Sequence, residues 1–132
     1  MSVIVDTSMW SHALRRGSES TDPQAAKLAG ILTQGQTVLL LGVVLQEVLQ
    51  GIKSARDFDR LSSHLDAFAL LPLEREDYVA AARLRNLCRA KGVQASTVDF
   101  QIAAACIGHD CALLTCDKDF ELISRFCPLR LL

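Results

Sequence analysis

Four acidic residues that are far apart in the sequence each stand where an apolar segment gives way to a helix-like segment. They are Asp6, Glu47, Asp99 and Asp117. The first and the last of them follow the apolar runs at 3–5 and 112–115, and the other two lie in the first turns of segments with helical spacing. The carboxyl ends of parallel strands share one edge of a sheet, so we expect the four carboxylates to converge on one pocket.

Carboxylates that converge repel one another and raise each other's pKa, so a cluster of this kind is tolerated mainly where a cation compensates its charge. Ligand sets made only of oxygen favour the hard cations Mg²⁺ or Mn²⁺ over zinc. Such a cation makes a bound water more acidic and stabilises the charge that develops when water attacks a phosphodiester. The pattern therefore predicts metal-dependent hydrolysis of phosphodiester bonds.

The same acids also have a purely structural interpretation. Aspartate is a preferred residue at helix caps and turns, and glutamate is a good helix former that is usually exposed. Glu47 adjoins a polar helix face that carries Gln46. In this interpretation the chain is a non-catalytic α/β interaction module. In the catalytic interpretation Asp6 holds a cation, and Thr7 or Ser8 caps the helix that follows.

Apolar runs of strand length alternate with segments of helical spacing along the chain. We expect strands at 3–5, 38–41, 67–71, 112–115 and 129–132, and helices at 24–34, 43–52, 55–65, 75–91, 99–107 and 117–124. In the second helix Val44, Val48 and Ile52 form one apolar stripe, and Trp10 is expected to pack in the core or an interface. The polar stretch Arg16–Pro23 is a predicted surface loop. This alternation predicts an α/β fold around a mostly parallel central sheet.

Composition narrows the class of protein. A chain of 132 residues, half of them hydrophobic and 22% charged, fits one globular domain. Its net charge of −1 excludes a polycation. Residues 1–10 show no secretory signal and the apolar run 38–45 is too short for a bilayer span, so we expect a cytoplasmic protein.

Cysteine usage points in the same direction. Five cysteines without a C-x-x-C pair favour free thiols in a reducing compartment over a disulfide framework. A zinc site from Cys106, His109, Cys111 and Cys116 is the alternative. Its spacing matches no familiar zinc pattern, and apolar neighbours such as those in AAACIG favour buried, structural cysteines.

Four short blocks of the sequence contain the four acids. They are V-D-T-S at Val5–Ser8, E-V-L-Q-G at Glu47–Gly51, V-D-F-Q-I-A at Val98–Ala103 and T-C-D-K-D-F at Thr115–Phe120. In this order and approximate spacing they resemble the conserved blocks of PIN-domain ribonucleases, and most closely the VapC-type toxins of prokaryotic toxin–antitoxin pairs. The resemblance covers essentially the whole chain. It implies one PIN-like nuclease domain over 1–132 with a three-layer α/β/α architecture.

The resemblance also implies an activity and a site. The activity is endonucleolytic cleavage of RNA with Mg²⁺ or Mn²⁺, leaving a 5′-phosphate and a 3′-hydroxyl. Catalysis and metal binding are assigned to Asp6, Glu47, Asp99 and Asp117, and the auxiliary candidates are Thr7, Ser8, Thr115, Lys118 and Asp119. Asp119 can equally cap the short helix after Thr115, and Thr115 can orient a carboxylate or a water. The implied partners are RNA, a cognate antitoxin that blocks the pocket, and a second copy in a homodimer.

RNA binding requires positive charge beside the acids. The candidate residues are Arg15, Arg16, Lys53, Arg56, Arg85, Arg89, Lys91 and Lys118, of which Lys118 is nearest to an acid in sequence. His12, two turns from Asp6, is a further candidate for contact with a base. A DNA-directed flap nuclease is a rival that uses the same metal chemistry but usually needs a longer chain. Receiver domains and aspartate-phosphorylating phosphatases need a second acid very near Asp6, where Thr7 and Ser8 stand.

Overall fold

The computed structural model describes residues 1–15 and 23–132, with the side chains of 12–15 outside the description. Four strands form one sheet in the order β3-β2-β1-β4: β1 (Ser2–Val5), β2 (Val38–Leu41), β3 (Ala69–Leu71) and β4 (Cys111–Leu114). All three strand pairs are parallel. The carboxyl ends of the strands therefore lie at one edge of the sheet, as the sequence predicts.

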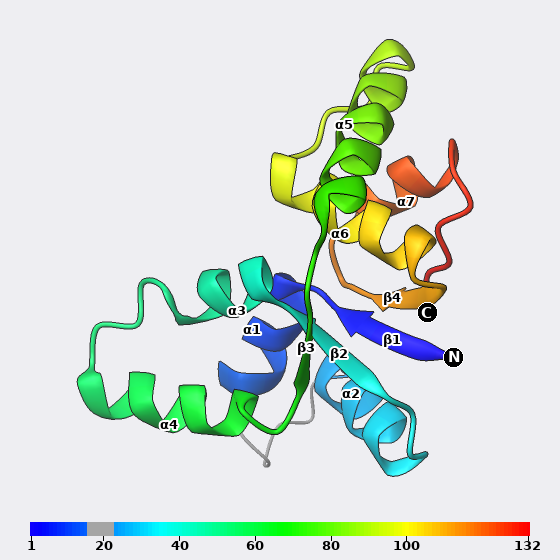
Figure 1. The fold of residues 1–132 in the computed structure, drawn as a ribbon. Coiled ribbons are helices and arrows are strands. Elements are labelled where there is room, and N and C mark those ends of the chain that lie inside the picture. Colours follow the sequence, from blue (N-terminus) through cyan, green and yellow to red (C-terminus); the bar gives the residue numbers. More distant parts are fainter. Residues whose placement is uncertain (16–22) are drawn as a thin grey trace.

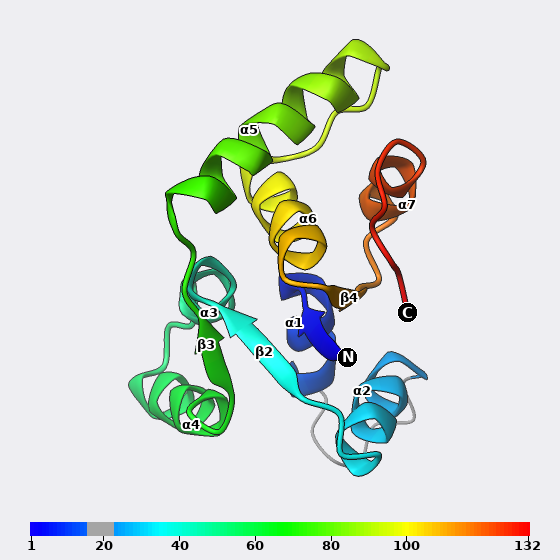
Figure 2. The same cartoon turned by 45° about the vertical axis from the view of Figure 1, so that its right-hand side comes forward.

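Helices cover both sides of this sheet. Within the described residues they are α1 (Thr7–Arg15), α2 (Pro23–Thr33), α3 (Gly42–Leu49), α4 (Ala55–Leu65), α5 (Arg75–Ala90), α6 (Thr97–Gly108) and α7 (Asp119–Ser124). In Figure 1, α5, α6 and α7 lie above the sheet, and α1, α2 and α4 lie below it. Figure 2 shows the same two helical layers with the strands between them. The predicted three-layer α/β/α fold with a mostly parallel sheet is confirmed.

The central strand β1 carries mostly apolar side chains because helices cover both faces of the sheet. It pairs with β2 on one side and with β4 on the other, so its side chains point only into helical layers. Ile4, Val5 and Leu113 are fully buried. Trp10 is also buried, donates from Nε1 to the Val5 carbonyl at 3.1 Å, and meets Phe68 edge-on with ring centroids 4.9 Å apart. It packs in the core, as predicted, and is not exposed for stacking on a base.

Two predicted elements, the strand at 129–132 and the helix at 43–52, are shorter in the structure than expected. The expected strand at 129–132 is reduced to one parallel bridge between Leu113 and Leu131, because the hydrogen bonds of Arg130 and Leu132 both go to Leu113. The helix expected at 43–52 ends at Leu49, and Gly51 then adopts φ +88°, which glycine tolerates. Ile52 therefore leaves the predicted apolar stripe and is exposed, whereas Val44 and Val48 are buried.

The strand predicted at 38–41 and the helix predicted at 55–65 have these same bounds in the structure, and the remaining elements differ from prediction by one or two residues at their ends. The strand expected at 67–71 begins at Ala69, the strand expected at 112–115 begins and ends one residue earlier, and the helix expected at 117–124 begins at Asp119. None of the described helices is both long and apolar enough to cross a membrane. Arg16 and most of the predicted loop lie outside the described residues, as do the side chains of His12 and Arg15.

Candidate active site

Three carboxylates meet at the carboxyl edge of the sheet. Asp99 comes from the first turn of α6, Asp117 from the loop after β4, and Asp119 from the start of α7. One oxygen from each lies within 4.8 Å of one from each of the others, and all three residues are half-buried. The spacing fits shared ligation of one cation by oxygen atoms. Asp119, expected to be auxiliary, thus belongs to the central group of acids.

A capping box fixes Asp99. The Ser96 hydroxyl accepts from the Asp99 backbone N–H at 3.1 Å, and the Asp99 carboxylate accepts from the Ser96 backbone N–H at 3.1 Å. Burial raises the pKa of Asp99, with further increases from the charges of Asp117 and Asp119, while the hydrogen bonds to Ser96 oppose them. Ionisation of this carboxyl is therefore less favourable than that of an exposed aspartate.

The loop after β4 positions Asp117. Its backbone N–H donates to the Thr115 hydroxyl at 2.9 Å, and its carboxylate accepts from the Asp119 backbone N–H at 2.9 Å. The carboxylate that receives a backbone N–H at the start of α7 is therefore that of Asp117. The alternative that Asp119 caps this helix is wrong, and its carboxylate is directed at the acidic group instead. Lys118, between the two acids, is exposed.

Asp6 is the buried acid of the site, with 3% of its surface exposed. One carboxylate oxygen accepts from the Met9 backbone N–H at 3.2 Å and from the Ser8 hydroxyl at 2.8 Å. The other accepts from the Thr115 hydroxyl at 2.7 Å. Asp6 itself caps α1, so the expectation that Thr7 or Ser8 takes over this role is wrong. Because the two oxygens face different partners, one carboxylate caps α1 and also accepts from Thr115.

Thr115 connects Asp6 to the acidic group. Its hydroxyl donates to Asp6 and accepts from the Asp117 backbone N–H, so it fixes both acids at once. Burial raises the pKa of Asp6, the hydrogen bonds from Thr115, Ser8 and Met9 lower it, and repulsion from Asp117 raises it further. Asp6 lies outside the group of Asp99, Asp117 and Asp119, but it is close enough to Asp117 for that residue's charge to raise its pKa.

Glu47 reaches the site from the opposite side of β1. It is half-buried on α3, and its carboxylate accepts from the Thr7 hydroxyl at 2.8 Å. The four predicted acids thus share one edge of the sheet, but only Asp99 and Asp117 belong to the group at ligand distance. Asp6 and Glu47 are held to that edge through hydroxyl groups of the threonine residues, Thr115 and Thr7.

Cys116 is a residue of the site that sequence reasoning missed. Its thiol donates to the Ser8 hydroxyl at 3.3 Å, and Ser8 donates to Asp6. Its position between Thr115 and Asp117 was the available signal. Of the other residues in the zinc alternative, Cys106 and Cys111 are buried, and His109 contacts Asp77 at 2.9 Å. In the described part of the chain, the group with metal-ligand spacing consists of carboxylates and not of these residues.

The donor set fits a hard divalent cation. Asp99, Asp117 and Asp119 supply only oxygen ligands, and their neighbouring negative charges, which add to the effect of burial in raising the pKa of Asp99, are charges that a cation would neutralise. Positive charge for a polyanionic ligand is also present at the surface. The exposed basic residues among the candidates are Lys53, Arg56, Arg85, Arg89, Lys91 and Lys118.

Replacing Thr115 with valine is expected to weaken Mn²⁺ binding about 10- to 100-fold, the usual cost of losing a group that orients metal ligands. Valine keeps the size and the strand propensity but removes both hydrogen bonds, to Asp6 and from Asp117. Isothermal titration with Mn²⁺ measures the effect. Thr115→Ser keeps the hydroxyl and serves as the control; equal Mn²⁺ affinity in wild type and Thr115→Val would show that the hydroxyl does not orient the site.

Comparison with known proteins agrees with this geometry. The PIN domain family model matches residues 3–125. Ribonuclease VapC18 of Mycobacterium tuberculosis is 31% identical over 105 residues, which cover 76% of this chain and 72% of that protein.

Solved structures share the fold. VapBC2 from Rickettsia felis, bound to a promoter DNA fragment, superposes with a TM-score of 0.81 at 20% identity, covering 100% of this chain and 98% of that one. VapBC-1 from nontypeable Haemophilus influenzae gives 0.80 at 14% identity, with coverage of 100% and 97%. FitAcB from Neisseria gonorrhoeae gives 0.77 at 18% identity, with coverage of 98% and 95%. With a family match over nearly its whole length and an acidic group at the carboxyl edge of its sheet, this chain belongs to the PIN-domain family, with a VapC ribonuclease among its relatives.

Proposed function

We propose that this protein is a Mg²⁺- or Mn²⁺-dependent endoribonuclease and the toxin of a type II toxin–antitoxin system. The observation that carries the proposal is the group of Asp99, Asp117 and Asp119, within 4.8 Å of one another, in a chain of the PIN-domain family. The relative VapC18 is named a ribonuclease, which favours RNA over DNA as the substrate. We assign residues 1–132 to a single nuclease domain, since one hydrophobic cluster joins β1, β2, β4 and the helices on both sides of the sheet.

In this proposal the carboxylates of the acidic group would bind the cation. Neighbouring residues would position these carboxylates. A divalent cation supplies positive charge that favours ionisation of water and stabilises the charge developing on the phosphate. Asp99, Asp117 and Asp119 provide its ligands, with Asp6 as a further ligand once its charge is compensated. The Thr115 hydroxyl hydrogen-bonds to both Asp6 and Asp117 and so fixes the position of one relative to the other. The attack of water on phosphorus leaves a 5′-phosphate and a 3′-hydroxyl.

Glu47 and the hydroxyl residues have supporting roles. Glu47 is half-buried and accepts from the Thr7 hydroxyl, and we assign to it the role of accepting a proton or binding a cation through water. Ser8 donates to Asp6 and helps to keep that carboxylate in position. Exposed Lys118, between two acids of the central group, provides the positive charge that the phosphate backbone needs near the site.

The partners follow from the same family. The Rickettsia felis and Haemophilus influenzae neighbours are VapBC complexes, so we infer a cognate antitoxin for this chain as well. We further infer a homodimer and a cytoplasmic location. Static light scattering of the purified chain tests whether it forms a homodimer. Fractionation of the native host cells tests the cytoplasmic location.

Purified protein, freed from any co-expressed partner, is expected to cut RNA in the presence of Mn²⁺ and to stop when EDTA is added. Mn²⁺ should also raise the melting temperature, because a ligand that binds only the folded state stabilises it. Mapping the RNA ends after induced expression, together with growth curves, tests the same activity in cells. Wild type should arrest growth, whereas Asp6→Ala and Asp99→Ala should not.

The rival functions give different results in these assays. A non-catalytic interaction module predicts no cleavage, Mn²⁺ binding only in the millimolar range or weaker, and equal growth for all three proteins. A DNA-directed nuclease predicts Mn²⁺-dependent cutting of single- or double-stranded DNA in preference to RNA. Equal toxicity of wild type and both variants would contradict the catalytic assignment.

A further inference from the structure

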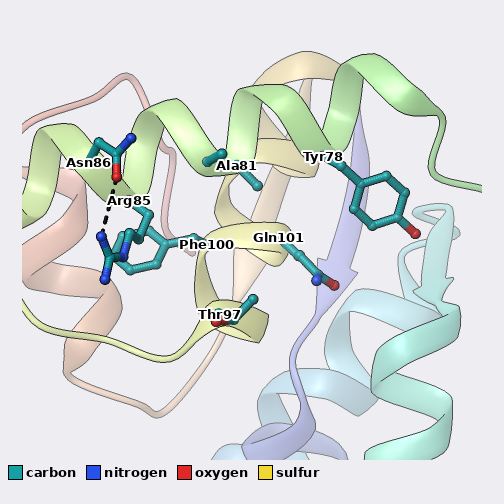
Figure 3. A pocket seen from close by; sticks show the side chains of 8 residues that line it. Tyr78, Ala81, Arg85, Asn86, Thr97, Phe100 and Gln101 are labelled. Atoms are coloured by element: carbon teal, nitrogen blue, oxygen red, sulfur yellow. Dashed lines mark hydrogen bonds between the residues drawn. The ribbon is translucent and has the colours of Figure 1, made fainter.

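A pocket opens between α5 and α6, next to the turn of α6 that carries Asp99. Its volume is about 280 Å³, close to the lower end of the roughly 300–1,000 Å³ of small-molecule clefts. Its main side chains are Tyr78, Arg85, Asn86, Thr97, Phe100 and Gln101. Figure 3 shows α5 along one side and α6 along the other, with Tyr78 towards one end and Asn86 towards the other. A single ring system fits this space better than a peptide segment.

The helical spacing of α5 explains why the pocket exists. Tyr78, Ala81, Ala82 and Arg85 stand at i, i+3, i+4 and i+7, so they share one face of the helix. The two small residues in the middle leave space that the long residues at either end enclose. Tyr78 is 52% exposed, and buried Phe100 contributes apolar surface from α6. The pocket therefore combines an accessible aromatic face with an apolar lining.

The polar groups of the pocket have unused hydrogen-bonding capacity. The Arg85 guanidinium donates to the Asn86 side-chain carbonyl at 3.3 Å, which leaves the amide protons of Asn86 available. The side chains of Tyr78, Thr97 and Gln101 form no hydrogen bond with one another or with any other residue in the described part of the chain. Donors and acceptors are thus arranged around an aromatic surface, as in sites that bind unpaired bases.

The pocket lies close to the proposed reaction centre but on the other side of α6. Thr97 and Gln101 are two residues before and two residues after Asp99, and a period of 3.6 residues places them on the helix face opposite to it. A helix with its side chains is about 10–12 Å across. A single strand with one phosphate at the acidic group can therefore reach the pocket within a few nucleotides by passing the beginning of α6.

We propose that the pocket between α5 and α6 binds one unstacked base of the RNA substrate, a few nucleotides from the bond that is cut. This inference rests on the proposed ribonuclease function. The base stacks on Tyr78, its edge bonds with the Gln101 amide, and Arg85, two turns further along α5, contacts the adjoining phosphate. Side-chain amides and guanidinium groups read base edges because they present donors and acceptors in one plane.

The test compares two ligands that differ only in their bases. A fluorescently labelled, random-sequence RNA hexamer and an abasic ribose-phosphate hexamer are titrated in EDTA, and fluorescence anisotropy gives both affinities. Wild type is expected to bind the RNA about 5- to 150-fold more tightly than the abasic backbone, the range that corresponds to the about 1–3 kcal/mol of stacking one base. Tyr78→Ala and Gln101→Ala should each lose most of this preference while binding of the abasic backbone stays the same.

Arg83→Ala is the matched control for Arg85→Ala. Both arginines are exposed on α5, but only Arg85 lines the pocket. Arg85→Ala should reduce the base preference and Arg83→Ala should not, with circular dichroism confirming that all variants fold. The inference is wrong if wild type shows no base preference, or if Tyr78→Ala changes only the oligomeric state, which would make the pocket a protein interface. RNA cleavage in Mn²⁺ is measured separately: wild-type cleavage without pocket dependence overturns only this inference, and absence of cleavage overturns the proposed function.

Discussion

Replacing Asp99 with asparagine is expected to lower the rate of RNA cleavage at least about 1,000-fold, because several kcal/mol of transition-state stabilisation depend on a correctly held cation. The substitution removes one negative charge from the group that includes Asp117 and Asp119. Asparagine keeps an oxygen that accepts from the Ser96 backbone N–H, so the capping box survives. Single-turnover cleavage of a labelled RNA in Mn²⁺ measures the loss.

The chain offers a closely matched control for this substitution. Asp57 occupies the same position in α4 that Asp99 occupies in α6, three residues after a capping serine, and its backbone N–H donates to Ser54. It is exposed and lies outside the acidic group. Asp57→Asn should therefore leave cleavage unchanged. If the two variants cleaved RNA equally well, Asp99 would be a capping residue and not a metal ligand.

Asp6→Asn is expected to reduce cleavage about 100-fold or more and, at the same time, to stabilise the protein in EDTA. The activity falls because the site loses a charged oxygen beside Asp117. The fold survives because an asparagine oxygen can accept from Ser8 and the Met9 N–H, while its amide can donate to the Thr115 hydroxyl. Stability rises by several degrees in melting temperature because no charge has to be buried.

The pH dependence of this gain has a definite sign. Burial raises the pKa of Asp6 above its ordinary value of 3.8, so the folded state binds this proton more tightly than the unfolded state does. The stabilising contribution of protonated Asp6 is fully present below the ordinary pKa and is lost as the pH rises through the raised pKa. In EDTA, the melting temperature of Asp6→Asn minus that of wild type should therefore grow from acidic to neutral pH.

Mn²⁺ should reverse the order of stability between the two proteins. Wild type gains the free energy of metal binding, and the variant, with one ligand fewer, gains less. Thermal melts with EDTA and with Mn²⁺ over a range of pH distinguish the two contributions. A variant less stable than wild type in EDTA at neutral pH would mean that the capping hydrogen bonds of Asp6 outweigh the cost of burying its charge.

The sequence by itself determined the architecture and the edge at which the acids gather. Continuous apolar runs such as 3–5 and 38–41 are typical of strands covered on both faces, and such strands pair in parallel with helices between them. Their carboxyl ends must then lie together, so any acid that follows a strand is brought to one place. That is why Asp6, Glu47 and Asp117, which follow β1, β2 and β4, could be selected from single positions in an alternating pattern. Asp99 follows α5 with no strand between, and it reaches the same edge because it stands at the start of α6, the helix that leads into β4.

Only the tertiary structure decided how these acids are grouped. Distances between side chains on different elements depend on loop geometry, which periodicity does not encode. The loop after β4 turns Asp119 towards Asp99 and Asp117, and it places the Thr115 hydroxyl between two acids. The pocket between α5 and α6 likewise depends on which faces of two distant helices meet, because its aromatic and amide groups come from both. The sequence specified the chemistry at the sheet edge, and packing between elements specified its arrangement.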